Sequence, residues 1–168
     1  TIIATAAVRY FMIKYSPGKM ITFDINEALS FGGESGPYLQ YSAVRAANIL
    51  KKLEDYDDTD DLAINAALPT LSTASLNDSQ GTDLWELVLN ASRLDEVVAQ
   101  AVRTLELGML AKYTFSLAQN FNAFYHRYPV IQEENRDVRI WRAAAVSYFR
   151  RQLTSALDLM GCKVPQRM

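Results

Sequence analysis

An aromatic ring and a guanidinium at helical spacing are the most chemically suggestive pair in this 168-residue sequence. Tyr38 and Arg45 are seven residues apart, which is about two turns of an α-helix, so both project from one face. Such a face can stack on a flat ring and pair with a polar group. The glycines just before it, Gly32, Gly33 and Gly36, permit positive φ and close backbone approach, which favours a compact loop that presents main-chain polar groups.

Charge is unevenly distributed, although 17 basic and 19 acidic residues leave a net charge of only −2. Six acids and no base lie between Glu54 and Asp61, whereas seven bases and two acids lie between Arg136 and Met168, a net charge of +5. We expect a polyanion to approach this basic third and to avoid the acidic stretch. An ordinary solvated helix face explains the same charges equally well.

The chain has a single cysteine, Cys162, and a single histidine, His126. An internal disulfide and a Cys/His zinc site are therefore excluded, so we predict no metal and expect a reducing, cytoplasmic setting. The apolar segment Ile2 to Ile13 contains Arg9 and is too short to span a bilayer, which predicts a core helix rather than a membrane anchor. The first residue is Thr1 rather than Met, which suggests processing or a fragment of a longer protein.

The elements that position these residues are predicted to be helices, because apolar residues recur every three or four positions along most of the chain. This pattern predicts an all-α fold, a bundle of about five or six helices in one domain over residues 1–168. Residues 55–81 are rich in Asp, Ser, Thr and Asn and are predicted to form a flexible loop, apart from a turn near 62–68. Gly161 is expected to end the last helix in a left-handed conformation. The predicted helices are 2–15, a short helix opened by a capping box at Asp24 and Glu27, 37–54, 82–105 with a break near 91–93, 109–128 and 136–160.

Three segments are similar to signatures of arginyl-tRNA synthetases. The first is FGGESGPYLQY at residues 31–41 followed by Arg45, which resembles GxTGPYLQYxxxR with Ser35 in place of Thr. The second is LAQNFNAFYH at 117–126, followed by PV at 129–130, which resembles LAxxFNxFYHxxxV. The third is LDLMGCKVPQRM at 157–168, which resembles the family ending GLDLLGIxxPxRM. The matches lie in family order and span nearly the whole chain, so the sequence resembles the C-terminal, tRNA anticodon-binding domain of that family.

The resemblance implies a helical bundle of the DALR type, which recognises the anticodon of the arginine tRNA within a class I arginine–tRNA ligase. In that family a separate Rossmann-type domain binds ATP with magnesium and arginine. Its HIGH-type motif needs two histidines, which this chain lacks, and the KMIT at 19–22 only superficially resembles a KMSK loop. We therefore expect this chain to be non-catalytic alone, with no cofactor of its own. Its expected partners are the arginine tRNA and the parent catalytic domain, with no membrane contact and a monomeric state.

The resemblance also assigns roles to residues of the first motif. Unpaired anticodon bases can stack on aromatic rings, and Arg can hold their edges or phosphates. Tyr38 is expected to stack on a base, and Arg45 to contact a base or the anticodon backbone. Gln40 either reads a base edge or satisfies buried backbone groups. Leu39 and Tyr41 are expected to be buried.

The remaining candidates come from the loop and from the other two motifs. The loop from Phe31 through Gly32 and Gly33 to Gly36 presents backbone groups to a base, or it only connects two helices. Asn122, Tyr125 and His126 are expected to line the anticodon-facing groove, although His126 fits a structural role equally well. Arg167 and Met168 are expected near the same surface, where a flexible thioether can pack against a base, unless the tail is frayed.

Two other interpretations remain open. A free-standing DALR-like protein could bind tRNA for another process or act as a protein adaptor. A helical interaction module could use its Met and aromatic stripe as a partner groove, which predicts a persistent exposed apolar patch and no affinity for RNA.

Overall fold

A computed structural model describes residues 2–168, and these are helical with no strand, as predicted. Six helices have eleven residues or more, in agreement with the expected number. The elements are α1 (Ile2–Ile13), α2 (Ile25–Ala28), α3 (Gly36–Asp57), α4 (Asp61–Ala67), α5 (Asp78–Ser92), α6 (Leu94–Thr104), α7 (Leu107–Arg127) and α8 (Arg136–Leu159), with 3₁₀ turns at Leu68–Thr70 and Thr73–Ser75.

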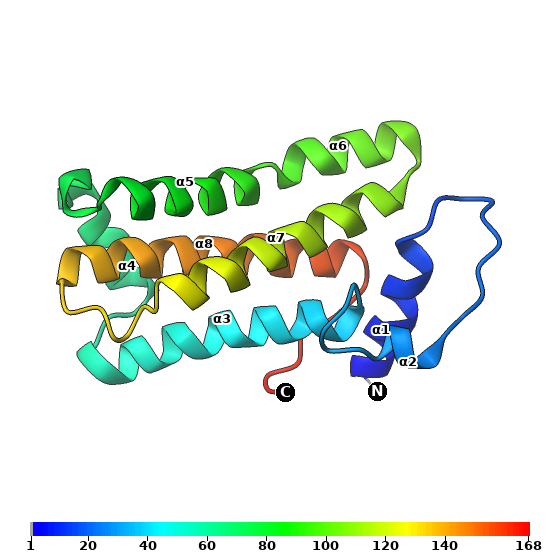
Figure 1. Cartoon of the computed structure of the whole chain (residues 1–168), viewed down its shortest axis with the longest axis horizontal. Helices are drawn as coiled ribbons and strands as arrows, with labels where there is room; N and C mark the ends of the chain where they lie inside the picture. The colour runs from blue at the N-terminus through cyan, green and yellow to red at the C-terminus, as the bar shows by residue number, and fades with distance from the viewer. Residues whose placement is uncertain (1) are drawn as a thin grey trace.

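The long helices α3, α7 and α8 run alongside one another, and α5 and α6 continue the bundle on the far side of α7 and α8 (Figure 1). The core lies between them. There the rings of Phe121 and Phe149 stack with centroids 4.1 Å apart, and neither side chain is exposed. No helix within residues 2–168 is long and apolar enough to cross a membrane.

Helix α3 begins where the sequence predicts it. The Ser35 hydroxyl caps the helix by accepting a hydrogen bond from the Tyr38 amide at 3.2 Å, and Pro37 occupies the first turn. Serine and threonine are both favoured at helix starts, so the serine at this position of the motif is compatible with capping. The helix continues to Asp57, three residues beyond the expected end. Gly161 has φ of 67°, which confirms the left-handed residue expected after α8.

Residues 55–81 are more ordered than predicted. They complete α3, form α4 and two 3₁₀ turns, and begin α5 at Asp78 rather than at Thr82. The Asp60 carboxylate accepts from the Ala63 amide at 2.7 Å, and the Asn77 side chain accepts from the Gln80 amide at 2.8 Å. Short polar side chains favour helix starts as well as loops, which is why their abundance suggested a loop. The flexible-loop prediction was wrong.

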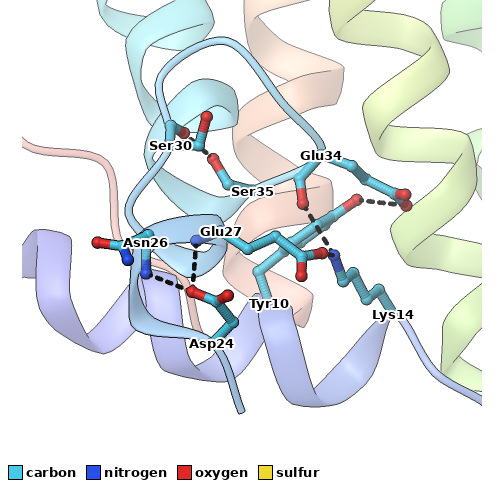
Figure 2. A network of polar contacts seen from close by, with 8 residues as sticks. All are labelled: Tyr10, Lys14, Asp24, Asn26, Glu27, Ser30, Glu34 and Ser35. Carbon is cyan, nitrogen blue, oxygen red and sulfur yellow. Dashed lines mark hydrogen bonds and ion pairs between the residues drawn. The ribbon is translucent and has the colours of Figure 1, made fainter. Parts of the chain in front are cut away.

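One end of the molecule is formed by α1, α2 and the loop before α3 (Figure 1), and polar contacts tie these pieces together (Figure 2). Lys14, which directly follows α1, is nearly buried, with its Nζ 2.6 Å from Glu27 Oε1 and 3.3 Å from the Glu34 carbonyl oxygen. The Tyr10 hydroxyl donates to Glu34 Oε1 at 3.3 Å. The capping box at α2 is only half formed: Asp24 accepts from the Asn26 and Glu27 amides, whereas the Glu27 carboxylate pairs with Lys14.

Candidate functional site

Helices α3 and α7 bring three of the predicted site residues together through one amide side chain. The Asn122 carboxamide oxygen accepts from Arg45 Nη1 at 3.0 Å. Its Nδ2 donates to the Tyr38 hydroxyl at 3.1 Å and to Ser42 Oγ at 2.9 Å. Positions 38, 42 and 45 of α3 lie on one helix face, so a single residue of α7 can reach all of them. The shared face predicted for Tyr38 and Arg45 is confirmed.

Tyr38 is wedged between the two helices. Its side chain is half-buried, its ring tilts against Phe115 with centroids 5.5 Å apart, and its hydroxyl receives the Asn122 hydrogen bond. These contacts hold the ring in place from two sides. Stacking of Tyr38 on a base remains a prediction. Because the side chain is half-buried, only part of its ring is free to stack.

A cleft of about 370 Å³ opens beside this cluster, between the middle of α3, the end of α7, the turn after α7 and the chain terminus. The Arg45 guanidinium lies over the Tyr125 ring at 4.9 Å from its centroid. Lys52 and Met168 also line the cleft, and 40% of Met168 is exposed. Aromatic faces, two cations and a thioether can accept a flat ring attached to an anionic backbone. Tyr125, Arg45 and Met168 are therefore brought together as predicted.

Sequence reasoning missed part of this cleft. Tyr41 was expected to be buried, but 42% of it is exposed and it lines the cleft. Asn48 and Lys52 line it too. Positions 41, 45, 48 and 52 follow the spacing of one helical stripe, so extending the face of Arg45 along α3 would have found them. Leu39 is fully buried, as expected.

Of the two roles predicted for Gln40, the structure shows the pairing with a buried backbone group. It is 0% exposed, and its Nε2 donates to the Lys163 carbonyl oxygen at 2.6 Å. A side chain with no exposed surface cannot touch a base, so its inclusion among the tRNA-contacting residues was wrong. Instead it anchors the C-terminal tail to α3, which helps to position Met168 at the cleft.

The glycine loop lies at the α1 end of the molecule and lines no part of the cleft. None of Gly32, Gly33 and Gly36 has positive φ, contrary to expectation. Gly36 is buried, and a Cβ on it would lie 2.3 Å from the Ala6 carbonyl oxygen, so its close approach is to α1 rather than to a ligand. Gly32 and Phe31 are exposed. Contact of Phe31, Gly32 and Gly33 with a base stays a prediction. Gly36 instead allows α1 and α3 to pack closely.

His126 and Arg167 are both exposed and lie outside the lining of the cleft. His126 follows Tyr125 on the last turn of α7, and Arg167 precedes Met168 at the chain end, so each is next to a lining residue in the sequence. Their contact with a ligand stays a prediction.

Ion pairs take up part of the positive charge of the basic C-terminal third. Arg139 is buried, and its Nη2 lies 2.9 Å from Asp57 Oδ2. Arg150 Nη2 lies 3.4 Å from Asp61 Oδ2. The acidic stretch therefore packs against α8 and pairs with two of its bases. Four other bases of residues 136–168 are exposed, so the approach of a polyanion to this third stays a prediction; they are Arg136, Arg151, Lys163 and Arg167.

The model of the DALR anticodon binding domain family matches residues 39–168. The arginine–tRNA ligase of Pyrococcus furiosus is 37% identical over 166 residues, which are 99% of this chain and 25% of the relative, and that of Thermococcus kodakarensis is 36% identical over the same shares. The solved Thermus thermophilus arginyl-tRNA synthetase superposes with a TM-score of 0.81 at 30% identity, over 99% of this chain and 27% of that one. This chain thus spans about a quarter of the length of these relatives. Since the family match covers most of its length, the chain belongs to the family of DALR anticodon-binding domains.

Proposed function

We propose that this chain is the tRNA-binding domain of an arginyl-tRNA synthetase. It recognises the anticodon of the arginine tRNA so that the parent enzyme can attach arginine to that tRNA with ATP. The observation that carries the proposal is the cleft in which the Arg45 guanidinium covers the Tyr125 ring next to Tyr41 and Met168. An unstacked base can lie on these surfaces while Arg45 and Lys52 attract its phosphates.

The catalytic step is assigned to the rest of the parent protein. Within residues 2–168, no group of three or more His, Cys, Asp or Glu side chains could hold a metal ion. We propose no step with ATP, magnesium or arginine for residues 2–168, because the chain spans only about a quarter of the length of its relatives. We also propose a monomeric parent in the cytoplasm, on the family resemblance and on the free, buried Cys162; sedimentation of the parent protein tests the monomer.

The test is titration of the chain with the arginine tRNA and with the same tRNA carrying an altered anticodon. We expect tighter binding to the unaltered tRNA and an affinity that falls as salt rises, because Lys and Arg contacts to phosphates release counterions. Equal affinity for both tRNAs would remove anticodon recognition from the proposal.

Paired variants locate the binding surface. Arg45→Ala and Tyr41→Ala should each weaken tRNA binding by about 1 to 3 kcal/mol, the usual contribution of one stacked base. The matched controls are Arg93→Ala and Tyr56→Ala, since Arg93 pairs with Glu96 on an exposed surface and 63% of Tyr56 is exposed outside the cleft. If the controls weaken binding as much as the cleft variants, the tRNA binds elsewhere.

A further inference from the structure

A pocket of about 210 Å³ opens between α4, α5 and α8, and both α4 and α5 pack against α8 (Figure 1). The described residues that line this pocket are absent from the lining of the cleft beside α3, so the two hollows are separate. An apolar cavity of about 150 Å³ is already large enough to hold a benzene molecule. The pocket therefore has room for one aromatic ring or for two fused rings.

The walls of the pocket are aromatic because of the spacing of residues along α8. Trp141, Ala144, Ala145 and Tyr148 share one face of this helix, and the two alanines lie between the two large rings. Trp85 of α5 also lines the pocket, so both tryptophans of the sequence contribute to it. Small side chains between large ones leave a hollow whose walls lack atoms to pack against. A planar ring in this hollow would supply the missing contacts.

The polar groups at the pocket favour an anion. Arg151 is the only charged side chain among the described lining residues, and its Cζ lies 6.0 Å from the centre of the Tyr148 ring. No described residue forms an ion pair or a hydrogen bond with Arg151. The preceding residue, Arg150, is paired with Asp61, and Ser147 donates to the same carboxylate. Arg151 thus presents an exposed fork of donors, which carboxylates and phosphates bind through two parallel hydrogen bonds.

We propose that this pocket binds a small aromatic anion, with one ring or two fused rings that carry a carboxylate or a phosphate. The rings lie between Trp85, Trp141 and Tyr148, and the acid group pairs with Arg151 at the exposed edge of the pocket. Apolar walls with a few convergent polar groups are typical of small-molecule sites. This binding goes beyond the proposed function and does not depend on tRNA.

The test uses naphthoate as the probe and the naphthylmethylammonium ion as its matched control, because the two share their rings and differ in the sign of their charge. Calorimetry measures the affinity of the 168-residue chain for each. Heteronuclear NMR locates the binding through the two indole N–H signals, and Trp85→Phe assigns them to Trp85 and Trp141. We expect naphthoate to shift both signals and to bind at least about tenfold more tightly than the ammonium ion, the minimum contribution of a hydrogen bond to a charged group.

Paired variants separate the charge from the cavity. Arg151→Gln should weaken naphthoate binding about tenfold and leave binding of the neutral naphthylmethanol unchanged. Its control is Arg103→Gln, which removes an exposed charge from α6 outside the pocket. Ala144→Leu fills the pocket and should abolish naphthoate binding, whereas Ala99→Leu at an exposed position of α6 should not. If circular dichroism shows that Ala144→Leu does not fold, Arg151→Gln still decides the question, because its side chain is exposed.

Three results would overturn the proposal: equal affinity for the two ions, naphthoate binding that is unchanged in Arg151→Gln, or indole signals that do not move. Displacement of naphthoate by the arginine tRNA would overturn it as well, because the pocket would then hold a nucleotide of that tRNA rather than a free small molecule. If the chain binds naphthoate but does not distinguish the two tRNAs, only the proposed function fails. If it distinguishes them but does not bind naphthoate, only this pocket is removed.

Discussion

At the scale of single residues, Asn122 organises the candidate site. Its half-buried amide joins Tyr38, Ser42 and Arg45 and so couples α7 to α3. Because Asn122 holds one edge of the Arg45 guanidinium, the plane of that group stays over the Tyr125 ring. Asn122 therefore orients the arginine that lines the cleft, and its own contact with a ligand stays a prediction.

Two substitutions of Asn122 should separate stability from binding. Asn122→Leu removes the amide and with it all of its hydrogen bonds. It should lower the free energy of unfolding by about 1 to 3 kcal/mol, the cost of leaving its half-buried polar partners unpaired. Asn122→Asp should cost less, because the carboxylate still accepts from Arg45 and the two hydroxyls can rotate to donate to it. The added negative charge should nevertheless weaken tRNA binding. Urea denaturation and tRNA titration of both variants measure this; a Leu variant as stable as the unmodified chain would contradict the role given to Asn122.

At the scale of elements, α3 serves both the core and the cleft. Leu39, Ala43 and Ala46 on one side are buried, whereas Tyr41, Arg45 and Lys52 on another line the cleft. Its first residue, Gly36, lets α1 cross at close range, since the Cβ of any larger residue would overlap the Ala6 carbonyl. The start of α3 is therefore fixed by packing as well as by its Ser35 cap.

Gly36→Ala should destabilise the protein by about 1 to 3 kcal/mol, the usual cost of overpacking a tight contact. The added Cβ would lie 2.3 Å from the Ala6 carbonyl oxygen, so α1 must move away from α3. Gly32→Ala is the matched control, because a Cβ there meets nothing within 4 Å. Thermal unfolding of both variants measures the difference, and equal midpoints would show that α1 does not rest on Gly36.

At the scale of the whole molecule, the C-terminal tail closes the fold. Cys162 is buried with its thiol 3.9 Å from the Ala6 carbonyl oxygen, and the Lys163 carbonyl accepts from Gln40. Contacts to α1 and α3 thus guide the tail toward the cleft that Met168 lines. The first and last helices of the chain are joined through this tail.

The stability of the fold should fall in alkaline solution because of Cys162. Burial raises the pKa of its thiol from 9.0 to about 11. Between these values the unfolded chain releases a proton that the folded chain keeps, so the free energy of unfolding decreases as pH rises from 9 toward 11. Cys162→Ala should reduce this loss by roughly 1 to 2 kcal/mol near the upper end. Denaturation of both proteins in reductant across this range measures it, and the tyrosines, present in both, cancel in the comparison. If the free energy of unfolding falls with pH equally in the two proteins, the thiol has the same pKa in the folded and the unfolded chain.

The sequence by itself determined the features that depend on neighbouring residues. Apolar spacing located the long helices, Ser35 and Pro37 marked the start of α3, and Gly161 marked the end of α8, because propensity and capping act within one or two turns. Three motifs indicated the family from local patterns alone. The same local reasoning is wrong for residues 55–81, because it predicts a loop where Asp60 and Asn77 cap helices.

Only the tertiary structure decided which helix faces are covered. Gln40 and Tyr41 are adjacent in one motif. Gln40 is buried and bonds to the backbone of the C-terminal tail at Lys163, whereas Tyr41 lines the cleft. Arg139 is basic in the sequence but is neutralised by Asp57, 82 residues away. The physical reason is that burial and ion pairing depend on which distant segments the chain brings together, and short-range spacing carries no information about those contacts.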